Sequence, residues 1–137
     1  MNSLNSQDKA NEWMLLQNQF DSYEKYSLII KLANVAILSG AYLTQHISVF
    51  VIALLLVMWL QDAIWKTFQS RIETRLLQLE AGLQNESDAK AYQFNSEYLK
   101  TRPGTVGLVM EYLRQAARPT IAFPHVVLVL MSVIQLI

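Results

Sequence analysis

The chain has 137 residues, with eleven basic and eleven acidic side chains, 53% hydrophobic residues and no cysteine. The length corresponds to one domain, and a formal charge of zero gives no electrostatic reason to expect a nucleic-acid partner. The absence of cysteine excludes disulfides, thiolate zinc sites and a thiol nucleophile. The hydrophobic residues are concentrated in uncharged stretches, which predicts an all-α integral membrane protein.

Residues 1–26 form the first predicted element, an amphipathic N-terminal helix. An apolar stripe recurs through it at helical spacing: Trp13, Leu16, Phe20 and Tyr23. Trp and Tyr favour the boundary between membrane and water. The segment has no early apolar core and is therefore not expected to be a secretory signal. The pattern fits equally a helix that lies on the membrane and one that docks from the cytosol.

A transmembrane helical hairpin is predicted next, over residues 27–65. Its first span, 27–44, rises about 27 Å as a helix, close to the hydrocarbon thickness of about 30 Å. Its second span, 47–65, carries the longest uncharged apolar run of the hairpin. Because the connection between the two spans is very short, they must be antiparallel neighbours.

The second span is expected to continue into a cytoplasmic helical segment, residues 66–118. An apolar seam with coiled-coil spacing runs along this helix: Trp65, Phe68, Ile72, Leu76, Leu79 and Leu83. The seam must be buried against other helices of the chain, a second copy or another protein. A polar loop at 84–88, a short helix at 92–100 and a turn at Pro103-Gly104 follow. In the next predicted helix the apolar residues fall on one face: Val106, Val109, Met110, Leu113 and Ala117.

A third transmembrane helix is predicted over residues 119–137. The loop between the first two spans has no Lys or Arg, whereas all eleven basic residues lie within 1–31 and 66–118. Basic residues close to membrane spans stay in the cytoplasm. The sequence therefore predicts a multi-pass protein of a bacterial-type inner membrane, with a cytoplasmic N-terminus and a periplasmic C-terminus.

Three ionisable residues fall at one depth, about one turn inside the cytoplasmic ends of the spans: Lys31, Asp62 and His125. A charge in hydrocarbon is costly, so such residues usually face a partner or water. An ion pair of Lys31 with Asp62 is expected, with His125 as a candidate third member and Asn34 as a hydrogen-bond partner one turn deeper. Alternatively, Lys31 reaches the headgroups, Asp62 marks the membrane exit, and His125 bonds a freed backbone carbonyl. A proton relay or ligand site is a further alternative.

Small residues recur every four positions along the first span, at Ala36, Gly40 and Thr44. Such spacing lets helix backbones approach closely. The expected packing partner is the second span or a second copy of the chain, and chance placement is the alternative.

The sequence contains no catalytic pattern: no Gly-rich phosphate loop, no Ser-His-Asp order and no His-Glu-x-x-His run. We expect no enzymatic activity, cofactor or metal. The hairpin that continues into a cytoplasmic helix resembles, in outline only, two-span bacterial effector proteins of defence systems, and the third span departs from that outline.

A non-enzymatic small membrane protein that acts by association is the function we expect. It would be an accessory or regulatory subunit, or a self-assembling scaffold, with membrane lipid and further copies or subunits as its partners. The alternatives are an oligomeric pore, and an immunity-type inhibitor that binds a toxin or channel in the bilayer.

Overall fold

The protein is represented by a computed structural model that describes residues 2–84 and 90–137. The described residues form helices and no strand, in this order: α1 (Asn2–Leu43), α2 (Val49–Gln84), α3 (Phe94–Thr101), α4 (Thr105–Ala116) and α5 (Pro119–Leu136). By length and composition, α1, α2 and α5 can each cross a membrane. The predicted all-α class and the three candidate spanning helices are thus confirmed. The loop predicted at 84–88 lies almost entirely outside the described residues.

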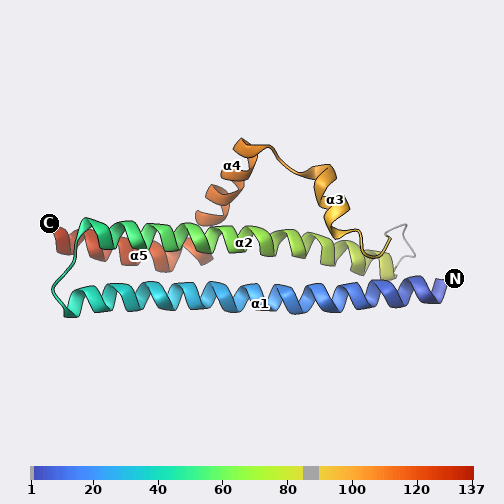
Figure 1. Ribbon diagram of the computed structural model, residues 1–137, viewed down its shortest axis with the longest axis horizontal. Helices are drawn as coiled ribbons and strands as arrows, with labels where there is room; N and C mark the ends of the chain where they lie inside the picture. The colour runs from blue at the N-terminus through green and yellow to red at the C-terminus, as the bar shows by residue number, and fades with distance from the viewer. Residues whose placement is uncertain (1, 85–89) are drawn as a thin grey trace.

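The first helix is longer than predicted. α1 is one helix of 42 residues, about 63 Å long, without a break between residues 26 and 27. The predicted N-terminal helix and the predicted first span are therefore parts of one continuous helix. Neither Gly nor Pro occurs between residues 2 and 39, so nothing in the backbone interrupts the helix. Because the N-terminal half continues straight from the candidate span (Figure 1), it cannot lie flat on a bilayer that the span crosses.

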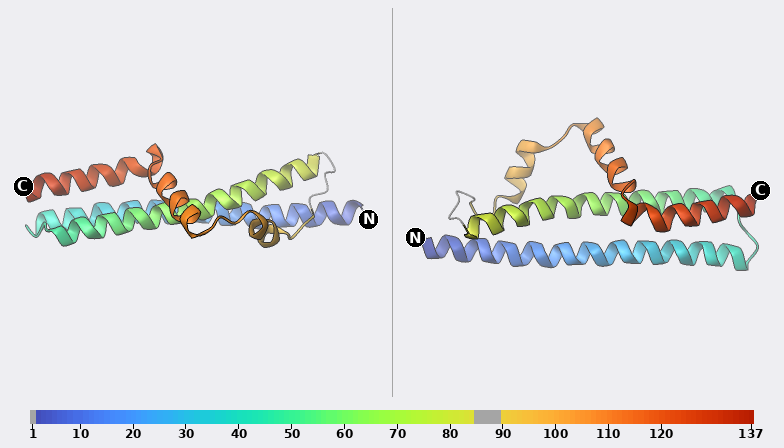
Figure 2. Two further views of the ribbon diagram at one scale, coloured as in Figure 1. Left: turned by 90° about the horizontal axis from the view of Figure 1, so that it is seen from above. Right: turned by 180° about the vertical axis from the view of Figure 1, so that it is seen from behind.

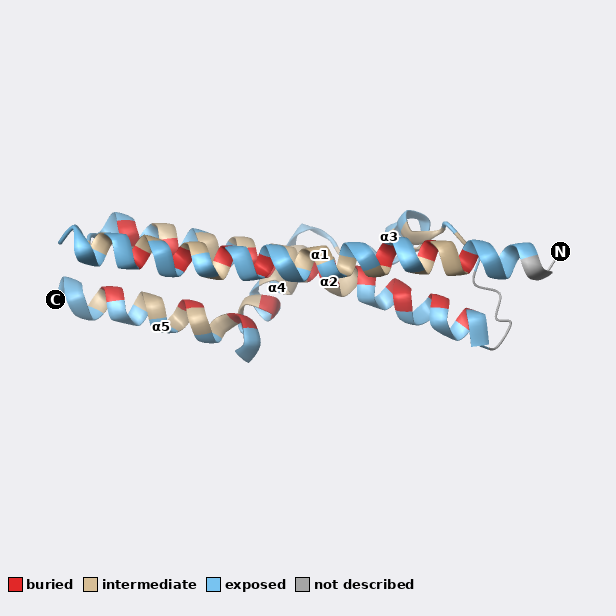
Figure 3. Cartoon of the chain, turned by 90° about the horizontal axis from the view of Figure 1, so that it is seen from below, coloured by how far each residue is buried: buried red, intermediate tan, exposed pale blue. Residues whose placement is uncertain are grey.

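α1 and α2 form a long antiparallel hairpin, and buried residues follow their contact along its whole length (Figure 3). In the half away from the turn, the core consists of Leu16 from α1 and Ile72, Leu76 and Leu79 from α2. It is flanked by aromatic side chains: Trp13, Phe20, Tyr23 and Phe94. The apolar stripe of α1 thus packs on the predicted seam of α2.

The ends of the seam behave differently from its centre. Leu83 is 40% exposed, and Trp65 packs its ring against Tyr23, Tyr26 and Phe68. The central seam residues are therefore buried inside the chain, which leaves them no surface for a second copy.

The remaining helices cover different halves of this hairpin. α5 lies beside the half that contains the turn and runs parallel to α1 (Figures 1 and 2). α3 and α4 lie over the other half and the middle of α2, and both run across the hairpin axis (Figure 1). α4 contacts α2 and α5.

Charge divides the molecule into two halves. Residues 32–61 and 126–137 contain no Lys, Arg, Asp or Glu. α2 runs antiparallel to α1, and α5 runs parallel to α1. The uncharged stretches of the three helices therefore lie side by side. The contacts of Asp62 with Lys31 and His125 place those three residues at one level, where the uncharged half begins. We call the two parts the uncharged half and the charged half.

Candidate functional site

The candidate site is a polar cluster centred on Asp62 of α2, which is fully buried. Ser27 Oγ of α1 donates a hydrogen bond to Asp62 Oδ1 at 2.5 Å. His125 Nε2 of α5 lies 3.0 Å from Oδ2, and Lys31 Nζ of α1 lies 3.8 Å from the same oxygen. One carboxylate therefore joins all three candidate spanning helices.

The orientation of the His125 ring is set by its neighbours. Asn34 Nδ2 lies 2.7 Å from His125 Nδ1 and 3.4 Å from the carbonyl oxygen of Leu55. An amide NH₂ group can only donate, so Nδ1 accepts, and Nε2 carries the proton that is donated to Asp62. The Trp59 ring stacks on the imidazole, with ring centroids 6.1 Å apart and planes inclined by 14°. The network thus aims Nε2 at the Asp62 carboxylate and Nδ1 at Asn34.

Lys31 contacts two groups at the edge of the cluster, a backbone carbonyl of α5 and the Asp62 carboxylate. Pro124 has no N–H, so the carbonyl of Thr120, four residues earlier in α5, loses its helical partner. Lys31 Nζ lies 3.4 Å from that carbonyl oxygen, while its ammonium also faces Asp62. The alternative in which His125 bonds a carbonyl freed by Pro124 is wrong, because both ring nitrogens are engaged elsewhere. The Lys31 ammonium therefore provides a formal counter-charge to Asp62.

The structure therefore brings Lys31, Asn34, Asp62 and His125 together. Sequence reasoning missed Ser27, which stands at the start of the predicted first span. The available signal was its spacing: Ser27, Lys31 and Asn34 follow each other at four and three residues, on one face of a helix. Asn34 Oδ1 is buried without a hydrogen-bond partner among the described residues.

The small residues Ala36, Gly40 and Thr44 do not lie in the α1–α2 contact. All three are exposed, and a Cβ added at Gly40 would meet nothing within 4 Å. The second span is therefore not their packing partner, which corrects one of the two expected partners. The reason is helical phase: α1 turns another face inward, made of Ile30, Asn34 and Leu38.

An apolar groove of about 540 Å³ lies beside this small-residue face, between α1 and α5 in the uncharged half. Its walls include Leu38 and Leu128, and its polar members are Ser39, Tyr42 and Gln135. The groove exists because α5 packs mainly on α2 and approaches α1 less closely.

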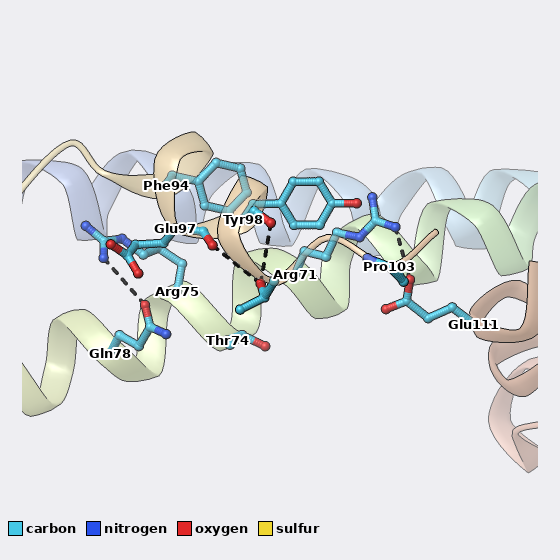
Figure 4. A pocket seen from close by; sticks show the side chains of 10 residues that line it. Arg71, Thr74, Arg75, Gln78, Phe94, Glu97, Tyr98, Pro103 and Glu111 are labelled. Carbon is cyan, nitrogen blue, oxygen red and sulfur yellow. Dashed lines mark hydrogen bonds and ion pairs between the residues drawn. The ribbon is translucent and has the colours of Figure 1, made fainter. Parts of the chain in front are cut away.

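A second, polar cleft of about 360 Å³ lies in the charged half, between α2, α3 and α4 (Figure 4). Arg71 pairs with Glu111 of α4 at 3.1 Å, and its guanidinium lies 4.6 Å from the ring centroid of Tyr98. Arg75 makes two bonds to the Glu12 carboxylate of α1, at 2.9 and 3.2 Å. Both arginines are engaged within the chain, where they tie α4 and α1 to α2.

The chemistry of the polar cluster differs from that of a nucleophilic triad. In such a triad the His contacts the nucleophile, whereas here Asp62 stands between Ser27 and His125. In the described part of the chain, no three His, Asp or Glu side chains converge in the manner of metal ligands. The contacts of the cluster instead fix three helices against each other.

Comparison of the chain with protein families, curated proteins and solved structures found no match in any of the three. A functional assignment therefore rests on the residues and contacts described above.

Proposed function

We propose that the protein crosses a bacterial-type inner membrane three times, through α1, α2 and α5. The N-terminus, α3 and α4 are cytoplasmic, and the hairpin turn and C-terminus are periplasmic. The support is the distribution of basic residues: all eleven lie in the charged half or at its edge, and none lies near the turn. Basic residues close to spans stay in the cytoplasm.

Within this membrane the protein acts by association and without enzymatic activity, as an accessory or regulatory subunit or a self-assembling scaffold. The observation that carries this function is the groove between α1 and α5. A groove between two spans accepts a third transmembrane helix, and the exposed Ala36 and Gly40 beside it permit close backbone approach. Ser39 and Gln135 offer hydrogen bonds to such a helix.

The same geometry favours association within the spans over the other candidates. The centre of the α2 seam is already buried against α1, so it is not the proposed interface. An oligomeric pore needs a polar stripe along a span, but Asp62, His125 and Asn34 face the interior of one chain. An inhibitor that binds a membrane partner could use the same groove.

The mass of the complex extracted in mild detergent tests this function. Ser39→Trp fills the groove, whereas Val57→Trp adds the same side chain on an exposed face of α2. We expect wild type and Val57→Trp to run above the mass of one chain, and Ser39→Trp to fall toward it. A wild-type mass equal to one chain, with no second component, contradicts the proposal.

A further inference from the structure

α4 carries an exposed apolar face in the charged half of the molecule. Its four side chains are exposed by 80, 52, 62 and 55%: Val106, Val109, Met110 and Leu113. Their spacing of three, one and three residues places them on one side of the helix. Gln115, which is buried, and Glu111 lie on the opposite side. The chain therefore builds an amphipathic helix but leaves its apolar face unpacked.

The direction of this face follows from the direction of the helix. α4 runs across the hairpin axis, whereas α1, α2 and α5 run along it (Figures 1 and 2). Glu111 reaches from α4 toward Arg71 and α3, deeper into the charged half (Figure 4). The apolar face is opposite Glu111 and therefore looks toward the uncharged half.

The level of α4 coincides with the edge of the uncharged half. The carbonyl oxygen of Ala116, at the end of α4, accepts a hydrogen bond of 3.2 Å from Trp59 Nε1. Trp59 precedes Asp62 by one helical turn, and a Trp indole is typical of a membrane boundary. Two exposed basic residues, Arg114 and Arg118, stand at the same end of α4.

We propose that α4 rests on the cytoplasmic leaflet, with its four apolar side chains in the boundary between headgroups and acyl chains. This inference rests on the proposed topology, which places the uncharged half in the bilayer. The occupant is lipid because the apolar face looks parallel to the spans and toward the uncharged half. In the proposed topology, the surface of the bilayer lies directly opposite this face. Arg114 and Arg118 then stand at the level of the phosphates, as basic residues do beside interfacial helices on anionic leaflets.

This placement connects the leaflet to the spans. Only Ala117 and Arg118 separate α4 from α5. The ion pair between Glu111 and Arg71 joins α4 to α2 on its other side. A change in how α4 sits on the lipid is thereby transmitted to two of the three candidate spans.

Single nitroxide labels on the full-length protein in nanodiscs of phosphatidylethanolamine and phosphatidylglycerol test the inference. The chain has no cysteine, so each introduced cysteine is labelled alone. Val109→Cys and Met110→Cys probe the face. Leu130→Cys, on an exposed position of α5, is the lipid control, and Ser96→Cys, exposed on α3, is the water control. Oxygen, which dissolves in lipid, and a water-soluble nickel chelate serve as the two relaxing agents.

We expect the oxygen-to-nickel accessibility ratio at Val109→Cys and Met110→Cys to be several-fold above that of Ser96→Cys and close to that of Leu130→Cys. A ratio equal to that of Ser96→Cys overturns the inference, because the face is then in water. Poor access by both agents also overturns it, because a protein then covers the face. A water-like ratio at Leu130→Cys instead contradicts the proposed topology, and so separates the two failures.

Discussion

Asp62 organises the packing of the third helix at the level of single residues. A buried carboxylate is tolerated only when hydrogen bonds and an opposite charge compensate for its lost hydration. Here Ser27 and His125 supply the hydrogen bonds and Lys31 supplies the charge. Since these partners come from α1 and α5, the cluster can form only when α5 has the correct register on the hairpin.

The partners of Asp62 should contribute unequally to the stability of the fold. His125→Leu should cost about 1.5–3 kcal/mol, because it removes a fully buried hydrogen bond to a charged group. Lys31→Met should cost less, because its ammonium is 3.8 Å from Asp62 and its side chain is 21% exposed. Double-mutant cycles with Asp62→Leu, measured by unfolding in mixed micelles, give the two coupling energies. A larger coupling to Lys31 than to His125 would show that the ion pair dominates.

Glu24 forms an acid-dependent contact in the charged half. Hydrogen bonds from Lys66 and Gln69, together with the charges of Lys66 and Lys31, lower the pKa of Glu24 below 4.5. A pKa that is lower in the folded than in the unfolded state stabilises the fold above pH 4.5, and this contribution is lost as the pH falls. Since Glu24 is 61% exposed, the contribution is at most about 1 kcal/mol.

Glu24→Gln checks this pH dependence. The variant should be less stable than wild type near neutral pH. The difference should shrink as the pH falls below 4.5 and vanish once Glu24 is protonated in the folded state as well. Unfolding curves of both proteins at several pH values measure it. A difference that persists in acid would mean that packing, and not charge, is responsible.

At the scale of elements, α2 performs two tasks with one continuous helix. Its apolar N-terminal half packs against α1 and α5, and its C-terminal half presents the seam to the N-terminal half of α1. The division falls near Asp62 and Lys66, where the sequence changes from uncharged to charged. The seam is thus a structural part of the monomer.

Leu79 tests that role of the seam. Leu79→Ala should cost about 2–5 kcal/mol, because Leu79 is fully buried in the core between α1 and α2. Leu77→Ala on the same helix should change stability by less than about 0.5 kcal/mol, because Leu77 is 59% exposed. Neither substitution should change the mass of the complex in detergent when the protein stays folded. Dissociation of a folded Leu79→Ala protein would show that the seam is an interface between copies.

At the scale of the whole molecule, the separation of charge determines the proposed orientation. Reporter fusions at Gln45 and at the C-terminus should report the periplasm, because both positions lie at the uncharged end. A fusion at Tyr92, which is exposed between α2 and α3, should report the cytoplasm. The inverted orientation, with Gln45 in the cytoplasm and Tyr92 in the periplasm, would require basic residues at the hairpin turn. A periplasmic signal at Tyr92 in the unchanged chain contradicts the orientation.

Part of this architecture follows from local properties of the amino-acid sequence. Three long apolar stretches, a connection too short for parallel neighbours and the purely helical secondary structure of residues 2–84 and 90–137 were all predictable, because length, hydropathy and charge are local. The common level of Lys31, Asp62 and His125 was equally predictable, since antiparallel helices of known rise align their residues by simple counting.

Only the tertiary structure decided which face of each helix meets which neighbour. α1 has several faces that can pack, and the relative rotation of α1 and α2 turns Ser27, Asn34 and Leu38 inward while Gly40 stays outside. The same rotation places the seam of α2 against α1, and the rotation of α4 about its own axis leaves the apolar face of α4 exposed. Rotation is a property of the whole set of contacts, because each helix must satisfy all its neighbours at once, and no single segment of sequence determines it.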